Sequence, residues 1–234
     1  MIVVALSAEE WSIVMLSLQV SLAAILGVLP VAFALAWVLA RTRFPGKILL
    51  DALVHLPLVL PPVVVGWLLL IAFAPEGPAG RVLGALGISV LFRWTGAALA
   101  AAVMALPLMV RAIRLSLEAV DPRLEAAART LGAGRWRTFA TITLPLASPG
   151  VLAGVVLGFA RSLGEFGATI TFVSNIPDET RTLPLAIYAA LQLPGGDSAV
   201  WRLAAVSVVL SLAALVASEA LSRRAGQGSG GHVL

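Results

Sequence analysis

The chain has no cysteine and little charge. Charged residues make up 12% of its 234 residues and hydrophobic residues 60%, whereas a soluble domain has about twice that charged fraction. The absence of cysteine excludes disulfides, cysteine-ligated zinc and thiol nucleophiles. The two histidines, His55 and His232, are too few and too far apart in sequence for a metal cluster. The composition predicts an integral membrane protein that binds no cofactor or metal itself.

The net charge of +4 does not indicate a nucleic-acid partner. Most basic residues stand beside the ends of apolar segments, and they are not interleaved with aromatic residues as in a nucleic-acid surface. Their positions report membrane topology. We therefore expect membrane lipid, and no nucleic acid, around this chain.

Five apolar stretches are long enough to cross a bilayer, which takes about 20 helical residues. They lie at about residues 12–40, 48–73, 94–113, 149–172 and 201–221. The first is not expected to be a cleavable signal peptide, because it is too long and follows Glu9 and Glu10 instead of basic residues. The predicted fold is all-α, with one transmembrane domain over residues 1–224 and a flexible tail over residues 225–234.

The second stretch contains Pro57, Pro61 and Pro62, which lack backbone donors, so the helix should be irregular there. A broken helix is tolerated in lipid only where it is buried in protein or lines a water-filled cavity. Pro61 and Pro62 are therefore candidates for the wall of a translocation path. A kink packed against a neighbouring helix explains them equally well.

Residues 121–145 form a polar insert between the third and fourth stretches. Asp121 is a good N-cap and Pro122 suits the first helical position, so a helix should begin there and stop near Gly132. A second helical piece over residues 134–143 places Trp136, Phe139 and Ile142 on roughly one face. The pattern predicts two short helices with a glycine joint. An amphipathic helix resting on anionic lipid is the alternative.

Seven positions of this insert are similar, at fixed spacing, to the EAA loop of bacterial ABC importer permeases: Glu125, Ala126, Ala127, Gly132, Ile142, Leu144 and Pro145. The resemblance implies a type I ABC importer permease fold in which this loop, including Arg129, is the coupling helix that sits in a cleft of a cytoplasmic ATPase. It also implies a homodimer of this subunit with two ATPase subunits and one external binding protein. Glu125 would cap or pair within the interface, Gly132 would let the joint bend back, and Trp136 and Phe139 would anchor the element on its own bundle.

Arg161 and Glu165 lie in the fourth stretch at i,i+4 spacing, so they can pair on one helix face. Charge at membrane depth commonly marks a path, and Arg161 would then attract an anion. A structural ion pair between packed helices is the alternative. Ser162, Gly164 and Gly167 are neighbouring candidates for the path or its gate, since glycines permit close approach or a bend.

Two segments, ARSLGEFGATITF from Ala160 and SNIPDETRTLPLAIYAALQLPG from Ser174, resemble the molybdate branch of the oxyanion importers. The resemblance implies molybdate as the transported ion, with tungstate, sulfate and thiosulfate as alternatives. Within the second segment, Thr180, Arg181 and Thr182 are candidate contacts for the binding protein, and Leu183 to Leu191 form a short amphipathic stretch.

An enzyme is not expected. The chain has no GxxxxGK[ST] phosphate loop, so ATP and magnesium would bind the partner ATPase. A membrane-embedded hydrolase would need a nucleophile and a base that the spans do not offer, and a passive channel would leave the coupling loop unexplained.

The distribution of basic residues predicts the orientation of the chain in the membrane. The side of the insert holds 11 Lys and Arg residues and the opposite side 4. The positive-inside rule then puts the insert and the C-terminus in the cytoplasm and the N-terminus outside, in a bacterial inner membrane. The 11 are Arg41, Arg43, Lys47, Arg111, Arg114, Arg123, Arg129, Arg135, Arg137, Arg223 and Arg224.

Overall fold

The computed structural model describes residues 6–229, with side chains from residue 6 to residue 217, and this part contains helices and no strand. Four helices are long and apolar enough to cross a membrane, or five if a sharply bent pair counts as one span. The helices are α1 Ala8–Arg41, α2 Lys47–Val59, α3 Pro62–Phe73, α4 Pro78–Ala85, α5 Trp94–Ala119, α6 Pro122–Thr130, α7 Arg135–Thr138, α8 Leu144–Leu163, α9 Gly167–Val173, α10 Leu183–Leu191 and α11 Asp197–Ser229.

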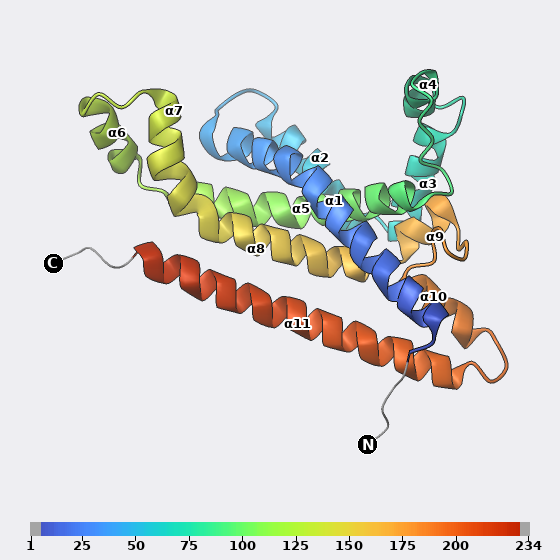
Figure 1. The fold of residues 1–234 in the computed structure, drawn as a ribbon. Helices are drawn as coiled ribbons and strands as arrows, with labels where there is room; N and C mark the ends of the chain where they lie inside the picture. Colours follow the sequence, from blue (N-terminus) through green and yellow to red (C-terminus); the bar gives the residue numbers. More distant parts are fainter. Residues whose placement is uncertain (1–5, 230–234) are drawn as a thin grey trace.

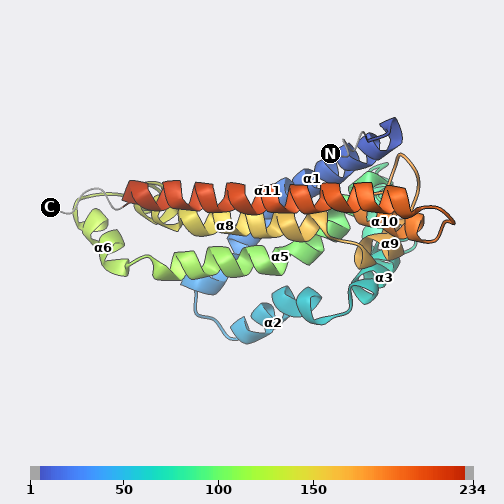
Figure 2. The ribbon, with the colours of Figure 1, turned by 90° about the horizontal axis from the view of Figure 1, so that it is seen from below.

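The long helices form an elongated bundle. Helices α5, α8 and α11 run side by side, and α1 crosses them obliquely (Figures 1 and 2). Helix α5 lies at the centre, with Ala97, Ala100 and Ala105 fully buried. It packs closely on α8, where a Cβ on Gly158 would lie 2.8 Å from Met109 Cγ. In lipid no hydrophobic effect draws helices together, so their association depends on close van der Waals packing. Small residues permit this close approach.

The second apolar stretch is broken, as its prolines predict. Helix α2 ends at Val59, α3 begins at Pro62, and the two are bent by 113°. Pro61 adopts an extended conformation at the break (φ −56°, ψ 134°), and neither proline can donate the bond that would continue a helix. The loop that follows contains the short helix α4.

The fourth apolar stretch differs from the prediction at both ends. The helix does not begin near residue 149, because Arg135–Leu163 is one helical segment that passes through a π-helical turn at Phe139–Thr143. Pro145 follows that turn and cannot donate a regular bond, and π-turns accommodate such an irregularity. Nor does the helix continue to residue 172: α8 ends at Leu163, and α9 starts at Gly167 after a turn.

The remaining segments mostly follow the sequence pattern. Helix α10 has the predicted bounds and is too short to span. Helix α11 continues to Ser229, so the first part of the tail predicted to be flexible, residues 225–229, is helical. The rest of the predicted tail lies outside the described residues. Helices α6 and α7 lie at the end of the bundle where α11 ends, and α3, α9 and α10 lie at the other end (Figure 1).

Candidate functional site: the coupling element and the helix breaks

The insert at residues 121–145 begins as predicted. The Asp121 side chain accepts a hydrogen bond from the backbone N–H of Arg123 at 2.8 Å and caps α6, with Pro122 at its first position. Gly132 has φ +87°, a left-handed conformation that favours glycine, and it joins α6 to α7. The second piece is not a separate short helix, since it is the first part of the segment that ends at Leu163. We call residues 121–145 the coupling element, after the loop that they resemble.

Glu125 ties the coupling element to the first helix. Arg41 at the end of α1 donates from Nη2 to Glu125 Oε1 at 2.9 Å, and Thr143 Oγ1 donates to the same oxygen at 2.7 Å. The side chains of Arg41 and Glu125 are largely buried. A partly buried pair with a further hydrogen bond is better defined than a solvated surface pair. The end of α1 and both ends of the coupling element are thus joined at one carboxylate.

Aromatic side chains make a second connection. The Phe139 ring lies edge-on to Trp37 of α1, with centroids 5.2 Å apart, and 6.1 Å from Phe33. Phe139 therefore anchors the element on its own bundle, as the sequence predicts. Trp136 does not anchor the element, because its side chain is 85% exposed and its one aromatic neighbour among the described residues is Phe139, with ring centroids 6.4 Å apart.

The other residues predicted for the coupling loop lie at the surface of the element. Ala126, Ala127, Arg129, Gly132, Leu144 and Pro145 are exposed and Ile142 is half-buried. Leu131 is 90% exposed and Leu124 is also exposed. This pair of exposed leucines is an apolar surface available to a partner.

The two helix breaks meet at the opposite end of the bundle. A Cβ placed on Gly167, at the start of α9, would lie 2.8 Å from Pro62 Cβ, at the start of α3. A Cβ placed on Gly66 would lie 2.5 Å from the Ala168 carbonyl oxygen. The structure therefore brings together Pro62 and Gly167, two of the predicted path residues, in a packed contact between α3 and α9. Pro61 beside them is exposed.

Arg161 and Glu165 form the predicted ion pair, with Arg161 Nη1 2.6 Å from Glu165 Oε2. The pair is not in the middle of a helix. Arg161 lies in the last turn of α8, and Glu165 lies in the turn before α9, where its Oε1 accepts from the backbone N–H of Ala168 at 2.8 Å. The pair thus stabilises the turn between α8 and α9. Ser162 is buried with its Oγ unpartnered, and Gly164 is exposed.

The predicted contacts for a binding protein are mostly inaccessible. Thr180 is fully buried, and its Oγ1 accepts from the backbone N–H of Ile176 and donates to the Ser174 carbonyl, which shapes the turn. Thr182 is buried as well. Arg181 is partly exposed, but it donates to Asn175 Oδ1 at 3.1 Å and pairs with Glu9 at 3.4 Å.

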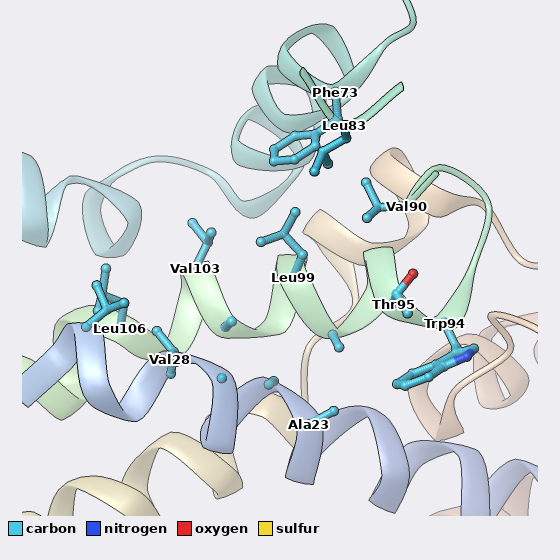
Figure 3. Close-up of a pocket in the computed structure, with 15 residues that line it drawn as sticks. Ala23, Val28, Phe73, Leu83, Val90, Trp94, Thr95, Leu99, Val103 and Leu106 are labelled. Carbon is cyan, nitrogen blue, oxygen red and sulfur yellow. The ribbon is translucent and has the colours of Figure 1, made fainter. Parts of the chain in front are cut away.

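A pocket of about 610 Å³ lies between α1, α5 and the α3–α4 region. Figure 3 shows it lined by apolar side chains such as Val28, Leu99 and Val103, with Thr95 as the one labelled oxygen-bearing side chain. Its polar groups are few, namely the Thr95 hydroxyl, which is buried without a hydrogen-bond partner, and the Trp94 indole N–H, and no charged side chain lines it to replace the hydration of an oxyanion. With no charge in its lining, this mainly apolar pocket does not suit a dianion.

A family model described as "Binding-protein-dependent transport system inner membrane component" matches residues 12–227. The chain belongs to this family. It is a transport subunit and not an enzyme, it is a multi-pass membrane protein, and the resemblance to ABC importer permeases is confirmed.

Relatives of this permease cover most of its length. The molybdenum transport system permease protein ModB of Escherichia coli K12 is 60% identical over 219 residues, which is 93% of this chain and 96% of the relative. The protein with the same name in Haemophilus influenzae is 57% identical, over 92% of this chain and 94% of the relative. The sulfate transport system permease protein CysT of Escherichia coli K12 is 41% identical, over 85% of this chain and 71% of the relative.

Solved structures share the fold of this permease. A bacterial ABC transporter that imports the acidic polysaccharide alginate superposes with a TM-score of 0.72 at 20% identity, covering 94% of this chain and 80% of the other. An amino acid ABC transporter gives a TM-score of 0.62 at 19% identity, covering 92% and 94%. The ABC importer permease fold is therefore shown.

Several contacts of the permease had no signal in the sequence. In the sequence, Arg41 indicates only membrane topology, yet in the structure it pairs with Glu125, which is 84 residues away. Asp51 pairs with Arg114 of α5 at 3.0 Å, which attaches α2 to the bundle. Ser17 of α1 accepts from the backbone N–H of Leu183 at 2.7 Å and positions α10. None of these partners is local in sequence, so no spacing rule finds them.

Proposed function

We propose that this permease carries molybdate into the cytoplasm as the membrane subunit of an ATP-driven importer. The observation that carries the proposal is the 60% identity, over 93% of this chain, to a protein named as a molybdenum permease. The named sulfate permease is 41% identical over a smaller share. Tungstate, sulfate and thiosulfate remain the alternative ions, because all are tetrahedral dianions of similar chemistry.

We infer that the coupling element transmits motion from an ATPase subunit. Its exposed Leu124 and Leu131 offer an apolar surface for docking. Glu125 fastens this surface to α1 through Arg41. From Arg135 the chain continues as one helical segment to Leu163, about 40 Å at 1.5 Å per residue. A displacement at the docking surface would therefore reach the Arg161–Glu165 turn and the contact between α3 and α9.

The assembly that we propose contains two copies of this chain, two ATPase subunits and one external binding protein. One chain leaves apolar side chains of α3 exposed, including Val63, Trp67 and Ile71, which suits a second copy or lipid. The basic residues favour a cytoplasmic coupling element and C-terminus and an external N-terminus. With that orientation, the turn at residues 174–182 faces the binding protein, and Arg181 is its one accessible member of the predicted contact set.

Co-purification and ATPase activity test this function. A tagged chain should retain an ATPase subunit, and the ATPase rate in proteoliposomes should rise when binding protein loaded with molybdate is added. Binding protein without ion is the control. Competition of unlabelled molybdate, tungstate, sulfate and thiosulfate against molybdate uptake ranks the ions. An ATPase that fails to associate would refute the coupling role, and stronger competition by sulfate would overturn the choice of ion.

A further inference from the structure

A basic pocket of about 300 Å³ lies between the end of α1 and the coupling element. Three arginines line it, Arg41, Arg129 and Arg135, together with Glu125. Glu125 neutralises Arg41 through their ion pair. Neither Arg129 nor Arg135 forms an ion pair within the described part of the chain. The pocket therefore has an excess of two positive charges.

Two buried polar atoms of this basic pocket lack hydrogen-bond partners. They are Arg41 Nε and Thr138 Oγ1, and Thr138 is 1% exposed. Both residues line the pocket. A buried donor without an acceptor costs free energy of roughly 1–3 kcal/mol, and native structures rarely leave such groups unsatisfied. An oxygen-rich anion would supply acceptors to both atoms and to the two free arginines.

An apolar pocket of about 560 Å³ adjoins the basic one. It is lined by Phe33, Trp37 and Val38 of α1 and by Trp136 and Phe139 of the coupling element. The two pockets share Trp37, Arg135 and Phe139, so positive charge and apolar surface are continuous. Tryptophan and arginine together are typical of the level where a membrane meets water. The pair of pockets thus matches a ligand with an anionic head and an apolar tail.

We propose that these two pockets bind one anionic phospholipid. Its phosphate accepts from Arg41 Nε and Thr138 Oγ1 and pairs with Arg129 and Arg135. An acyl chain lies along Phe33, Trp37 and Trp136. The lipid then fills the space between α1 and the coupling element and strengthens a junction that depends on Glu125 and Phe139. This also explains why Trp136 is exposed in the protein alone: its partner is lipid. The proposal concerns the junction and does not depend on which ion is transported.

Lipid retention measures this site. Full-length protein in mixed phosphatidylglycerol and phosphatidylcholine is analysed by native mass spectrometry for bound lipid. We expect one phosphatidylglycerol to remain bound preferentially. The double variant Arg129→Gln and Arg135→Gln should weaken that binding about 30-fold, from the loss of two charges near the membrane surface. The matched control is Arg123→Gln with Arg137→Gln, which removes two charges from the same helices at exposed positions that line neither pocket.

Tryptophan quenching tests the same site without changing an arginine. The contribution of Trp136 is the difference between wild type and Trp136→Phe. Brominated-chain phosphatidylglycerol should quench it several-fold more than brominated-chain phosphatidylcholine.

Equal quenching by the two lipids, or equal loss of lipid in the control and test variants, would overturn the proposal. A parallel experiment replaces the lipid with millimolar inorganic phosphate or molybdate and measures binding at the same arginines. If either binds at the arginines while phosphatidylglycerol does not, the pocket is a site for a small oxyanion and the lipid proposal is wrong.

Discussion

The two ends of the bundle are joined by different kinds of contact (Figure 1). At the coupling end, Glu125 and Phe139 hold the element to α1, and a Cβ on Gly132 would meet nothing within 4 Å. At the other end, Gly66 and Gly167 bring α3 and α9 into backbone contact. Close packing makes α3 and α9 one unit, whereas a few polar and aromatic contacts leave the coupling element accessible to a partner. Substitutions at each end test this difference.

The largest effect is expected at the packed end. Gly66→Ala places a methyl group 2.5 Å from the Ala168 carbonyl oxygen, so α3 must move away from α9. We expect the free energy of unfolding to fall by about 3 kcal/mol. Gly84→Ala is the control, since its methyl group meets nothing within 4 Å in α4 and should stabilise by about 0.5–1 kcal/mol. Thermal unfolding followed by tryptophan fluorescence compares them, and equal midpoints would contradict the packing argument.

Arg161→Gln should have the next largest effect. The Glu165 side chain is 1% exposed and would keep only the bond from Ala168, whereas Arg161 is 25% exposed. An unpaired carboxylate in a fully buried site lowers the free energy of unfolding by several kcal/mol. We expect a loss of about 2 kcal/mol here, because the position of Arg161 is partly exposed and water can reach the Glu165 carboxylate from that side. Glu165→Gln preserves an acceptor for Ala168 and should cost less.

Two measurements separate a structural role of this pair from a role in the translocation path. They are the amount of protein in the membrane and the uptake per protein molecule. A lower amount with normal uptake per molecule indicates a structural pair. Normal amounts with slow uptake would instead assign Arg161 to the path.

Glu125→Gln tests the polar junction at the coupling end. The variant can still accept from Thr143 but leaves the Arg41 charge unpaired. The expected loss is about 1–2 kcal/mol, reduced from the fully buried case because both side chains retain some exposure. Uptake per ATP should fall several-fold. Glu118→Gln is a matched control, because its i,i+4 pair with Arg114 is exposed and contributes about 0.5 kcal/mol or less. Unchanged coupling in Glu125→Gln would remove Arg41 from the mechanism.

Features that depend on local chemistry were predictable from the sequence. The cap at Asp121, the break at Pro61 and the bounds of α10 follow from residues within one or two turns. The break after Leu163 was missed, because the apolar run continues through residues 164–172 and the glycines there do not by themselves require a turn. The turn depends on Glu165 capping α9 and on Gly167 packing against Pro62, a contact with another helix.

The candidate site was predictable only in part for the same reason. Its residues were found through matched spacing, but their partners lie far away in sequence. Arg41 and Trp37 belong to the first helix, and neither carries a pattern that indicates Glu125 or Phe139. The exposure of individual side chains could not be predicted either. Trp136 has the helical spacing of an anchor but is exposed, and Thr180 is buried inside its turn.

The smallest effect on the free energy of unfolding is expected at Gly132, where the backbone and not the available space limits substitution. Gly132→Ser requires a side chain at φ +87° and should cost about 1 kcal/mol. Gly134→Ser has equal space at φ −66°, where serine caps α7 well, so it should be neutral or slightly stabilising. Gly132→Val is more strained because valine is β-branched, and it should uncouple ATP hydrolysis from uptake or block ATPase association. Because Gly132 joins the docking surface on α6 to the segment that ends at Leu163, normal uptake and association in Gly132→Val would show that the coupling element is not a rigid lever.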